Sequence, residues 1–191
     1  IGNIFFAPMP FGGATIVTEH MGRLLKEKHG WDVIVLTSIQ DPDMIDYSIR
    51  RYSVHGLDVI AVKLPHIHPH SRTNWDNPDF NRVLETVLHR LQPDVVHWHS
   101  IQNFGATALD TVRRTGIPMA LTVHDCWFLC ERQFMINHAG AYCHQWSIDP
   151  KVCRFCLPDA KASALRNEQL LGLLNQCELI LFPSEFHRQL H

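Results

Sequence analysis

The chain alternates short, continuous apolar runs with longer amphipathic stretches. The run WDVIVLTS at 31–38 has an unbroken Val, Ile and Leu centre, which is typical of a strand covered on both faces. The apolar run at 1–8 predicts another strand, and 14–29 predicts the helix between them, with Gly30 as its stop. The apolar side chains of this helix recur at nearly helical spacing: Ile16, Val17, Met21, Leu24 and Leu25. Strand, helix and strand in succession form a parallel crossover unit.

The same alternation continues to the end of the chain. Residues 47–64 alternate apolar and polar side chains and predict two short strands that meet around Gly56. The later elements are predicted strands at 93–100, 119–123 and 178–182, helices at 80–91, 105–114 and 160–175, a polar loop at 65–78 and a final turn at 183–191. The sequence therefore predicts an α/β fold: a Rossmann-like, doubly wound, mostly parallel sheet with helices on both faces.

Length and charge narrow the classes of function. A chain of 191 residues suits one domain, 1–191, with one core. The balance of 17 Lys+Arg against 19 Asp+Glu, without a long run of either sign, argues against nucleic acid as a partner. No apolar run approaches the roughly 20 residues of a transmembrane helix. The expected partner is a small molecule or a glycan, and the expected location is the cytoplasm.

The alternation is interrupted only between residues 124 and 157, where periodicity is weak. A loop of this length in a compact domain is usually functional. Four of the six cysteines fall in this insertion loop: Cys130, Cys143, Cys153 and Cys156. Two thiolates spaced as in Cys153-Arg-Phe-Cys156 can hold one zinc ion at about 2.3 Å, and two more would complete a tetrahedron.

A structural zinc site at these four cysteines is the expectation, because a metal would give a loop of sparse apolar content its folding energy. Reduced thiols and one or two disulfides stay open as alternatives. His138 and His144 are candidates to replace one thiol. Cys126 and Cys177 each lie beside a predicted strand, where an isolated cysteine usually serves as a small buried apolar residue.

The first predicted strand ends in the turn PMPFGGAT. Gly12 and Gly13 would let backbone N–H groups approach an anion, and the following helix start adds its positive dipole end, which together suit a phosphate. A tight turn without a ligand is the alternative. The dinucleotide fingerprint G-x-G-x-x-G is absent, so a nicotinamide-dependent enzyme is disfavoured.

Histidines gather where the predicted strands end. His97 and His99 lie two residues apart on one strand and share a face, and His124 closes the neighbouring strand at the same edge. Each alone could be a packed or capping residue, but beside the glycine turn they favour a site for phosphate or sugar hydroxyls. The loop at 65–78 carries a second group, for which solvated side chains are the expectation over a metal site: His66, His68 and His70.

A family resemblance rests on five segments in order: PMPFGGAT, QPDVVHWHS, GIPMALTVHDCWFLC, the cysteines at 143, 153 and 156, and ELILFPSEF. Their succession resembles the N-terminal domain of family 4 glycosyltransferases, which are retaining enzymes of the GT-B fold. The HD-x-W-x-x-C element with its later cysteines resembles a subset of that family.

The resemblance implies two Rossmann-like domains that face each other across a cleft, of which this chain supplies the first, on the acceptor side. The C-terminal domain, which binds the nucleotide sugar and carries a Glu-x7-Glu motif, would lie outside this chain. Glu19 and Glu27 have that spacing but fall on the first predicted helix, so their match is a coincidence. We expect this chain alone to be inactive.

The resemblance also implies roles for individual residues. Gly12 and Gly13 would contact the donor diphosphate, together with His99 and Asp125 on the donor side. His124 would be the catalytic residue, over the reacting sugar. Asp125 is also expected to orient its turn by accepting backbone N–H groups. Two aromatic residues either pack under the loop or offer a stacking face to an acceptor sugar, and packing is the expectation for them: Trp127 and Phe128.

The predicted function is transfer of a sugar from a nucleotide-sugar donor to a glycan or lipid-linked acceptor with retention, at the inner face of the membrane if the acceptor lies there. No protein base is expected, because the leaving phosphate assists and its stabilisation is the main requirement. The alternative is a non-catalytic Rossmann-like binding module whose metal-stapled loop contacts a protein. A nucleotide-sugar epimerase is disfavoured by the missing dinucleotide fingerprint.

Overall fold

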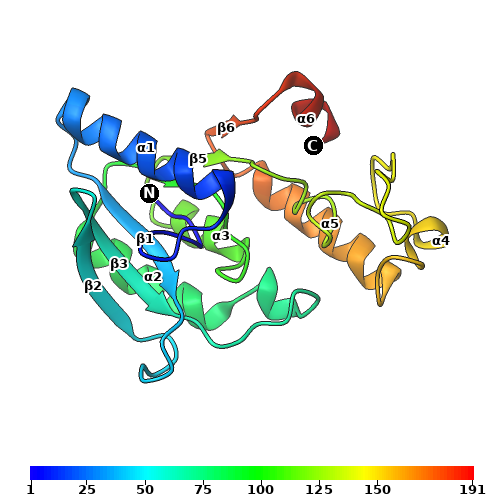
Figure 1. Ribbon diagram of the computed structural model, residues 1–191, viewed down its shortest axis with the longest axis horizontal. Coiled ribbons are helices and arrows are strands. Elements are labelled where there is room, and N and C mark those ends of the chain that lie inside the picture. The colour runs from blue at the N-terminus through cyan, green and yellow to red at the C-terminus, as the bar shows by residue number, and fades with distance from the viewer.

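The backbone of the first residues joins two three-stranded sheets into one. The computed structural model describes residues 1–191 (Figure 1). Gly2 bridges in parallel to Leu36 on one side and to Trp98 on the other, so the strand order is β2-β3-β1, the N-terminal segment, and then β4-β5-β6. The strands are β1 Ile34–Ile39, β2 Ile49–Val54, β3 Leu57–Lys63, β4 Val96–Trp98, β5 Met119–Thr122 and β6 Leu179–Leu181. This order confirms the predicted doubly wound sheet.

Each predicted helix forms, with small shifts at the ends. The helices are α1 Gly12–His29, the short 3-10 helix η1 Arg72–Asn74, α2 Pro78–Leu91, α3 Thr107–Arg113, α4 Pro150–Cys153, α5 Ala160–Leu174 and α6 Glu185–Leu190. The sequence pattern did not predict η1 or α4. Side chains fix several of the starts: the Asn77 Oδ1 accepts from the Phe80 N–H at the start of α2, and Asp159 accepts from two N–H groups at the start of α5.

The N-terminal segment is shorter than the strand predicted at 1–8, because its ladder ends after Ile4. The Gly2 N–H donates to the His97 carbonyl at 2.8 Å, and the His99 N–H donates to the Gly2 carbonyl at 2.8 Å. Glycine is required here, since a Cβ on Gly2 would lie 2.1 Å from the Trp98 ring. The chain continues from this segment through α1 to β1 on one side, and β4 lies on the other. The strand order therefore reverses between this segment and β4.

The hairpin of β2 and β3 is the antiparallel part of the sheet. Its two-residue turn, His55 and Gly56, has φ values of 52° and 77°, as hairpin turns that match the strand twist require. β3 then pairs in parallel with β1. The prediction of two strands meeting around Gly56 is confirmed.

The sheet is covered on both faces. The main core packs α2, α3 and α5 against one face through side chains that include Phe80, Leu84, Trp98, Leu109 and Leu170. The other face carries the smaller cluster with Val35 and Val59, and α1 lies over it (Figure 1). Alternate residues of β1 contribute to the two clusters, which is why its sequence reads as an unbroken apolar run.

Three of the five apolar side chains that recur along α1 are exposed, while Leu25 packs against the cluster of Val35 and Val59. Ile16, Val17 and Leu24 are 68%, 48% and 42% exposed, and the buried positions are Thr15, Thr18 and Gly22. A Cβ on Gly22 would lie 3.2 Å from Leu57 Cδ1, so the helix approaches the sheet through its small side chains. Close approach thus decides which face of α1 is buried.

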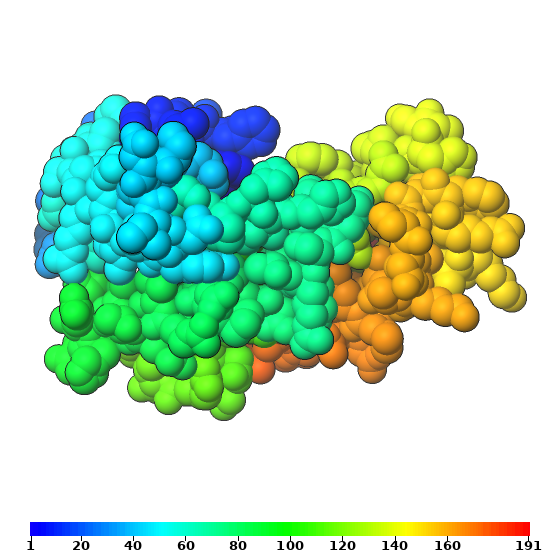
Figure 2. Space-filling view, turned by 90° about the horizontal axis from the view of Figure 1, so that it is seen from below, coloured from blue at the N-terminus to red at the C-terminus, as the bar shows by residue number.

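The cysteine-containing insertion extends from one end of the molecule. Figure 2 shows it mainly in yellow, protruding beyond the sheet domain next to α5, which is orange. Its backbone is mostly irregular, with one isolated bridge between Ile136 and Tyr142 and the single turn of α4. Two small apolar clusters pack it against α5 and α6, and both include cysteines: Cys126, Leu129, Met135 and Leu190 in one, and Cys153, Leu157 and Ala160 in the other. None of the helices has the length and apolar character needed to cross a bilayer.

Candidate functional site

The glycine turn forms the exposed first turn of α1. Gly12 and Gly13 are the first two residues of the helix, and Gly12 has φ of 73°, a backbone conformation that glycine adopts without strain. No side chain caps this helix start and no acid lies in its first turn. A Cβ on either glycine would meet no atom within 4 Å. The first N–H groups of a helix have no partner within it, so those of this uncapped turn can bind an anion.

Three histidine rings stack where β4 and β5 end. The rings of His97 and His99 lie 4.5 Å apart between centroids, and those of His99 and His124 lie 5.1 Å apart. The Nδ1 of His99 lies 2.8 Å from the Nε2 of His124, and the Nε2 of His97 lies 2.8 Å from the Oγ1 of Thr122. The structure thus brings the three predicted histidines together at the carboxyl edge of the sheet. The ligand contact predicted for His99 stays a prediction.

Burial keeps these imidazoles neutral. It lowers the pKa of His97 to about 4, with nearby positive charge as a smaller cause. It lowers the pKa of His99 to about 2, helped by the neighbouring rings of His97 and His124. The pKa of His124 is also lowered, first by burial and then by His187. At neutral pH, His124 therefore offers a neutral ring to a ligand rather than a cation.

The Asp125 carboxylate holds the turn that follows His124. Its Oδ1 accepts the Trp127 N–H at 2.8 Å, and its Oδ2 accepts from the Gln102 side chain at 3.2 Å. This confirms the predicted orienting role, while a contact with donor stays a prediction. Burial raises the Asp125 pKa, opposed by these two hydrogen bonds and by the charge of Arg166.

Trp127 and Phe128 pack into the core, as expected. They are 2% and 4% exposed, and their rings meet edge to face with centroids 5.2 Å apart. Sequence reasoning missed Arg166 of α5, whose guanidinium lies 4.7 Å from the centre of the Trp127 ring. Burial lowers the Arg166 pKa to about 10. As one charged residue within a helix pattern, Arg166 gave no signal that it lies under the site.

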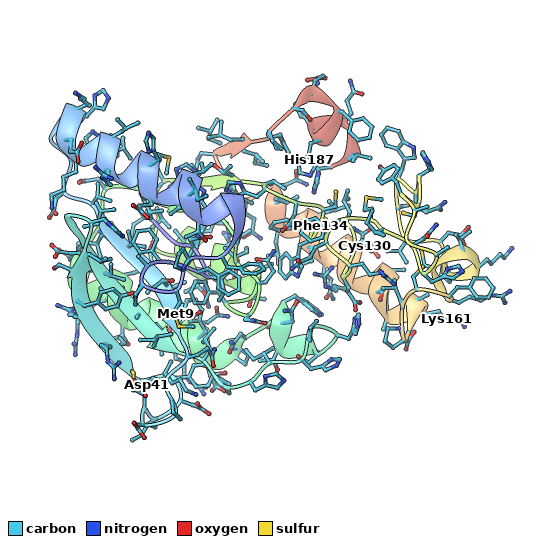
Figure 3. All side chains as sticks on the ribbon, in the orientation of Figure 1. Met9, Asp41, Cys130, Phe134, Lys161 and His187 are labelled. Atoms are coloured by element: carbon cyan, nitrogen blue, oxygen red, sulfur yellow. The ribbon has the colours of Figure 1, made fainter.

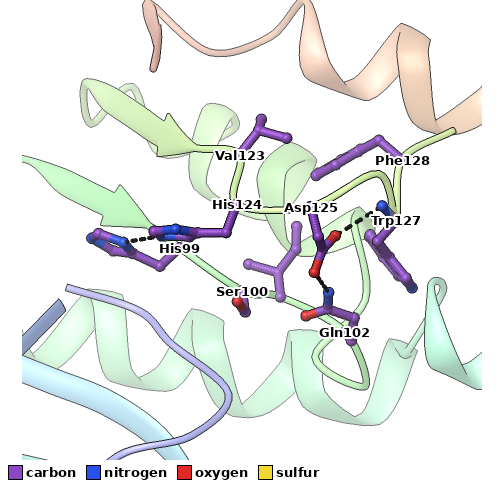
Figure 4. A pocket seen from close by; sticks show the side chains of 9 residues that line it. His99, Ser100, Gln102, Val123, His124, Asp125, Trp127 and Phe128 are labelled. Carbon is purple, nitrogen blue, oxygen red and sulfur yellow. Dashed lines mark hydrogen bonds between the residues drawn. The ribbon is translucent and has the colours of Figure 1, made fainter. Parts of the chain in front are cut away.

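A hollow opens between the two strand ends (Figure 4). It is small, with a volume of about 10 Å³, which is room for about one water molecule, and its walls come from the residues that follow β4 and β5. Its polar walls are His99, Ser100, Gln102, His124 and Asp125. Open parallel sheets bind ligands in crevices at the carboxyl ends of their strands. This hollow lies at that edge, one strand from the point where the strand order reverses.

The cysteines of the insertion are free thiols, and no disulfide forms. Cys130, Cys143, Cys153 and Cys156 line one hollow of about 280 Å³, together with ten other residues. No group of three or more His, Cys, Asp or Glu side chains is arranged to hold a metal ion. The arrangement does not support the predicted zinc site.

The thiols serve instead as parts of the apolar clusters that pack the insertion. Figure 3 shows Cys130 in this segment, where it packs against the cluster of Leu129 and Met135. The Nδ1 of His138 lies 3.7 Å from the Cys156 sulfur, so this histidine contacts one thiol only. The loop therefore has more apolar content than its sequence suggested, because cysteine packs as a small apolar residue.

The histidines of the loop at 65–78 are exposed, as expected: His66, His68 and His70. The Nδ1 of His70 lies 2.5 Å from the Glu131 Oε2, which ties this loop to the insertion. The end of the same loop is buried, however. Asn77 is 0% exposed and donates from its side chain to the Asn103 carbonyl at 2.7 Å. Only the first part of this loop is therefore solvated.

The family model described as Glycosyltransferase Family 4 matches residues 11–191, from the glycine turn to the last residue. The chain belongs to glycosyltransferase family 4. None of the curated proteins compared with it matches it in sequence. The match includes both the glycine turn and the histidine cluster, so the candidate site lies within the family's shared region.

Solved structures place this family 4 domain in the GT-B fold. It is similar to a trehalose-6-phosphate structure from E. coli bound with UDP-2-fluoro glucose, with a TM-score of 0.53 and 13% identity over 98% of this chain. It is also similar to the α,α-trehalose 6-phosphate synthase from Burkholderia multivorans, with a TM-score of 0.52 and 12% identity over 99% of this chain. In both cases the domain spans 40% of the length of the other chain. At this identity the likeness shows the Rossmann-like fold of a GT-B half.

Proposed function

We propose that this domain is the acceptor-side half of a retaining glycosyltransferase that uses a nucleotide-sugar donor. The observation that carries the proposal is the placement of two features at the carboxyl edge of the sheet: the uncapped turn of Gly12 and Gly13, and His124 beside the hollow. The glycine turn can bind an anionic diphosphate, and His124 can contact the sugar attached to it. Membership of family 4 supports this assignment.

The donor diphosphate would lie against the first turn of α1. Free N–H groups and the positive end of an 18-residue helix favour negative charge there. The E. coli structure that shares this fold is bound with UDP-2-fluoro glucose, which supports a nucleotide sugar as the donor. The identity of the sugar and of the base would be set by contacts outside this chain, in a C-terminal donor-binding domain.

In the proposed reaction the bond between the anomeric carbon and the diphosphate oxygen breaks, and a bond from the acceptor oxygen forms on the same face of the sugar. The acceptor hydroxyl gives its proton to the departing phosphate oxygen, so no protein base is needed. His124 would hydrogen-bond the reacting sugar or the departing phosphate. Because its pKa is lowered, it would do so as a neutral N–H donor.

The proposed acceptor is a glycan or a lipid-linked sugar. Met9 and Phe11 beside the glycine turn are 62% and 71% exposed, so they offer apolar surface to the face of a sugar ring or to a lipid. Phe5 packs against Phe11, with ring centroids 5.3 Å apart, and extends this surface. These side chains precede the proposed diphosphate site in the chain and belong to the loop that ends in it.

The test uses the native enzyme that contains this domain, with a panel of nucleotide sugars and of glycan and lipid-linked acceptors. We expect release of nucleoside diphosphate from one donor only when an acceptor is present, and a product whose anomeric configuration, measured by NMR, equals that of the donor. Inversion would overturn the retaining mechanism. A folded protein that binds none of the donors would overturn the transferase and favour the binding module.

A further inference from the structure

The hydrogen bond between His99 and His124 joins a fixed ring to a half-buried one. His99 is 2% exposed, and the ring of His97 stacks on its ring. The backbone N–H of His99 donates to the Gly2 carbonyl. His124 follows β5 and lines the hollow. Figure 4 shows the two rings side by side beyond the ends of β4 and β5, joined by this hydrogen bond. The orientation of the His124 ring therefore depends on a partner that cannot move away.

The protons of this pair can be assigned by counting partners. Only one of the two facing nitrogens can carry the proton between them when both rings are neutral. The Nε2 of His99 is buried and has no hydrogen-bond partner. If His124 donated, His99 would have to carry its proton on that buried Nε2, as an N–H without an acceptor. Buried N–H groups without a partner are rarer than unpaired acceptors.

The opposite arrangement leaves only a lone pair unpaired. His99 then carries its proton on Nδ1 and donates to the Nε2 of His124. The proton of His124 is placed on its own Nδ1, which makes no hydrogen bond within the chain and is not sealed from solvent. The buried partner thus decides which nitrogen of His124 can donate to a ligand.

We propose that His99 is a positioning residue that fixes the tautomer of His124, so that the Nδ1–H of His124 faces the ligand as a hydrogen-bond donor. His99 acts through His124 and needs no contact with ligand of its own. The part of the inference that concerns catalysis rests on the proposed function; the part that concerns the tautomer does not.

The direct test is ¹⁵N NMR of the native enzyme labelled on its histidine rings, in which protonated and unprotonated nitrogens resonate apart. The His124 signals are assigned by their loss in His124→Ala. We expect a protonated Nδ1 and an unprotonated, hydrogen-bonded Nε2. In His99→Phe, which keeps a ring but removes the nitrogen, we expect His124 to revert to a mixture of tautomers. An Nδ1 that is unprotonated in the wild type, or His124 signals that His99→Phe leaves unchanged, would overturn the proposal.

Two further variants keep the test decisive if His99→Phe folds poorly. His99→Asn keeps a hydrogen-bonding group near the position of Nδ1, and we expect it to retain the His124 tautomer. His97→Phe removes a nitrogen that bonds Thr122 and not His124, and we expect the His124 signals to keep their pattern. If the His124 tautomer were lost in His97→Phe but kept in His99→Phe, His97 and not His99 would fix it, and the proposal would be overturned.

Kinetics separates a positioning role from a structural one. We expect His99→Phe to lower kcat about tenfold, the effect of one neutral hydrogen bond, with little change in the KM of the donor. In the His124→Ala background we expect no further loss, because the group through which His99 acts is gone. Additive losses would show that His99 acts independently and would overturn the proposal. If no donor is turned over, the proposed function fails, while the NMR result still decides the tautomer.

Discussion

The indole Nε1 of Trp127 donates a hydrogen bond of 3.0 Å to the Oδ1 of Asn74. Asn74 in turn donates from its amide to the Asn103 side chain at 2.7 Å. These two bonds join three loops: the one that follows His124, the buried end of the loop at 65–78, and the one that follows β4. The turn that presents His124 is therefore supported from below by a polar network that carries no charge.

Removal of the indole donor should destabilise this support. We expect Trp127→Phe to lower the free energy of unfolding by about 2–3 kcal/mol, because it leaves a cavity and an unpaired buried amide oxygen. Trp146→Phe is the matched control, since Trp146 is 58% exposed and its change should stay within about 0.5 kcal/mol. Chemical denaturation measures both. Equal effects would contradict the role assigned to the Trp127 bond.

The glycine turn gives a test in which stability and binding should move in opposite directions. Gly13→Ala adds a methyl group that meets no atom of the chain, and alanine favours a helix over glycine by up to about 1 kcal/mol. We therefore expect a fold that is as stable or more stable, but a donor KM raised at least about tenfold, because the methyl group occupies the space of the diphosphate.

The control is Gly172→Ala in α5, where a Cβ also meets no atom within 4 Å. It should alter stability similarly and leave the donor KM unchanged. Steady-state kinetics on the native enzyme and thermal unfolding of the same samples supply both values. A wild-type donor KM in Gly13→Ala would contradict the placement of the donor diphosphate at this turn.

Much of the fold could be predicted from sequence, and its exceptions have physical causes. The apolar centre of β1 was enough to predict this strand, and the turn at His55 and Gly56 was enough to predict the hairpin of β2 and β3. The apolar spacing along α1 does not mark its buried face, because helix packing here depends on close approach through Thr15 and Gly22, and hydrophobicity alone does not measure side-chain size. The first strand was predicted too long because Phe5 and Phe6 are as apolar as the residues that pair.

The site was predictable only where the backbone alone places a residue. His99 and His124 end neighbouring parallel strands, so sequence position was enough to bring them to one edge. Arg166 reaches the site from α5 through tertiary packing, which no local pattern encodes. Cysteine spacing suggested zinc at Cys153 and Cys156, but spacing does not distinguish a ligand from a small apolar side chain in a cluster.

The number of free thiols tests the state of the cysteines. We expect six free thiols per chain by titration in denaturant, with or without prior reduction, because no disulfide forms. In the native protein, Cys126 and Cys177 should react slowly, since burial raises their pKa to about 11 and about 12. A count of four or fewer would contradict the free thiols. One zinc ion per chain in the same sample would mean that the thiols come close enough to coordinate a metal, which would contradict their arrangement in the structure.

The buried histidines predict a loss of stability in mild acid. Burial lowers the pKa of His97 to about 4 and of His99 to about 2, from an unfolded value near 6.5. The unfolded chain therefore binds more protons below pH 6.5, and the free energy of unfolding falls as the pH falls from about 6.5 toward 4. Each such ring contributes a slope of up to about 1.4 kcal/mol per pH unit, and less where solvent reaches it.

Denaturation between pH 7 and pH 5 measures this slope above the range in which most carboxylates titrate. In His97→Phe, one titrating ring is gone while its volume remains, so the slope should be shallower than in the wild type. Trp146→Phe supplies the control, since Trp146 is exposed and its replacement removes no titrating group, and it should keep the wild-type slope. Stability that stays level, or rises, as the pH falls to 5 would contradict the burial of these rings.

The most direct test of the account is release of nucleoside diphosphate by the native enzyme, with its preferred donor and acceptor, in the wild type and in His124→Ala. His144→Ala, in the insertion, is the control. We expect kcat to fall at least about a hundredfold in His124→Ala, because a donor to the reacting centre is lost, with donor binding kept and His144→Ala at the wild-type rate. A folded His124→Ala enzyme that turns over at the wild-type rate would contradict the placement of His124 at the reacting centre.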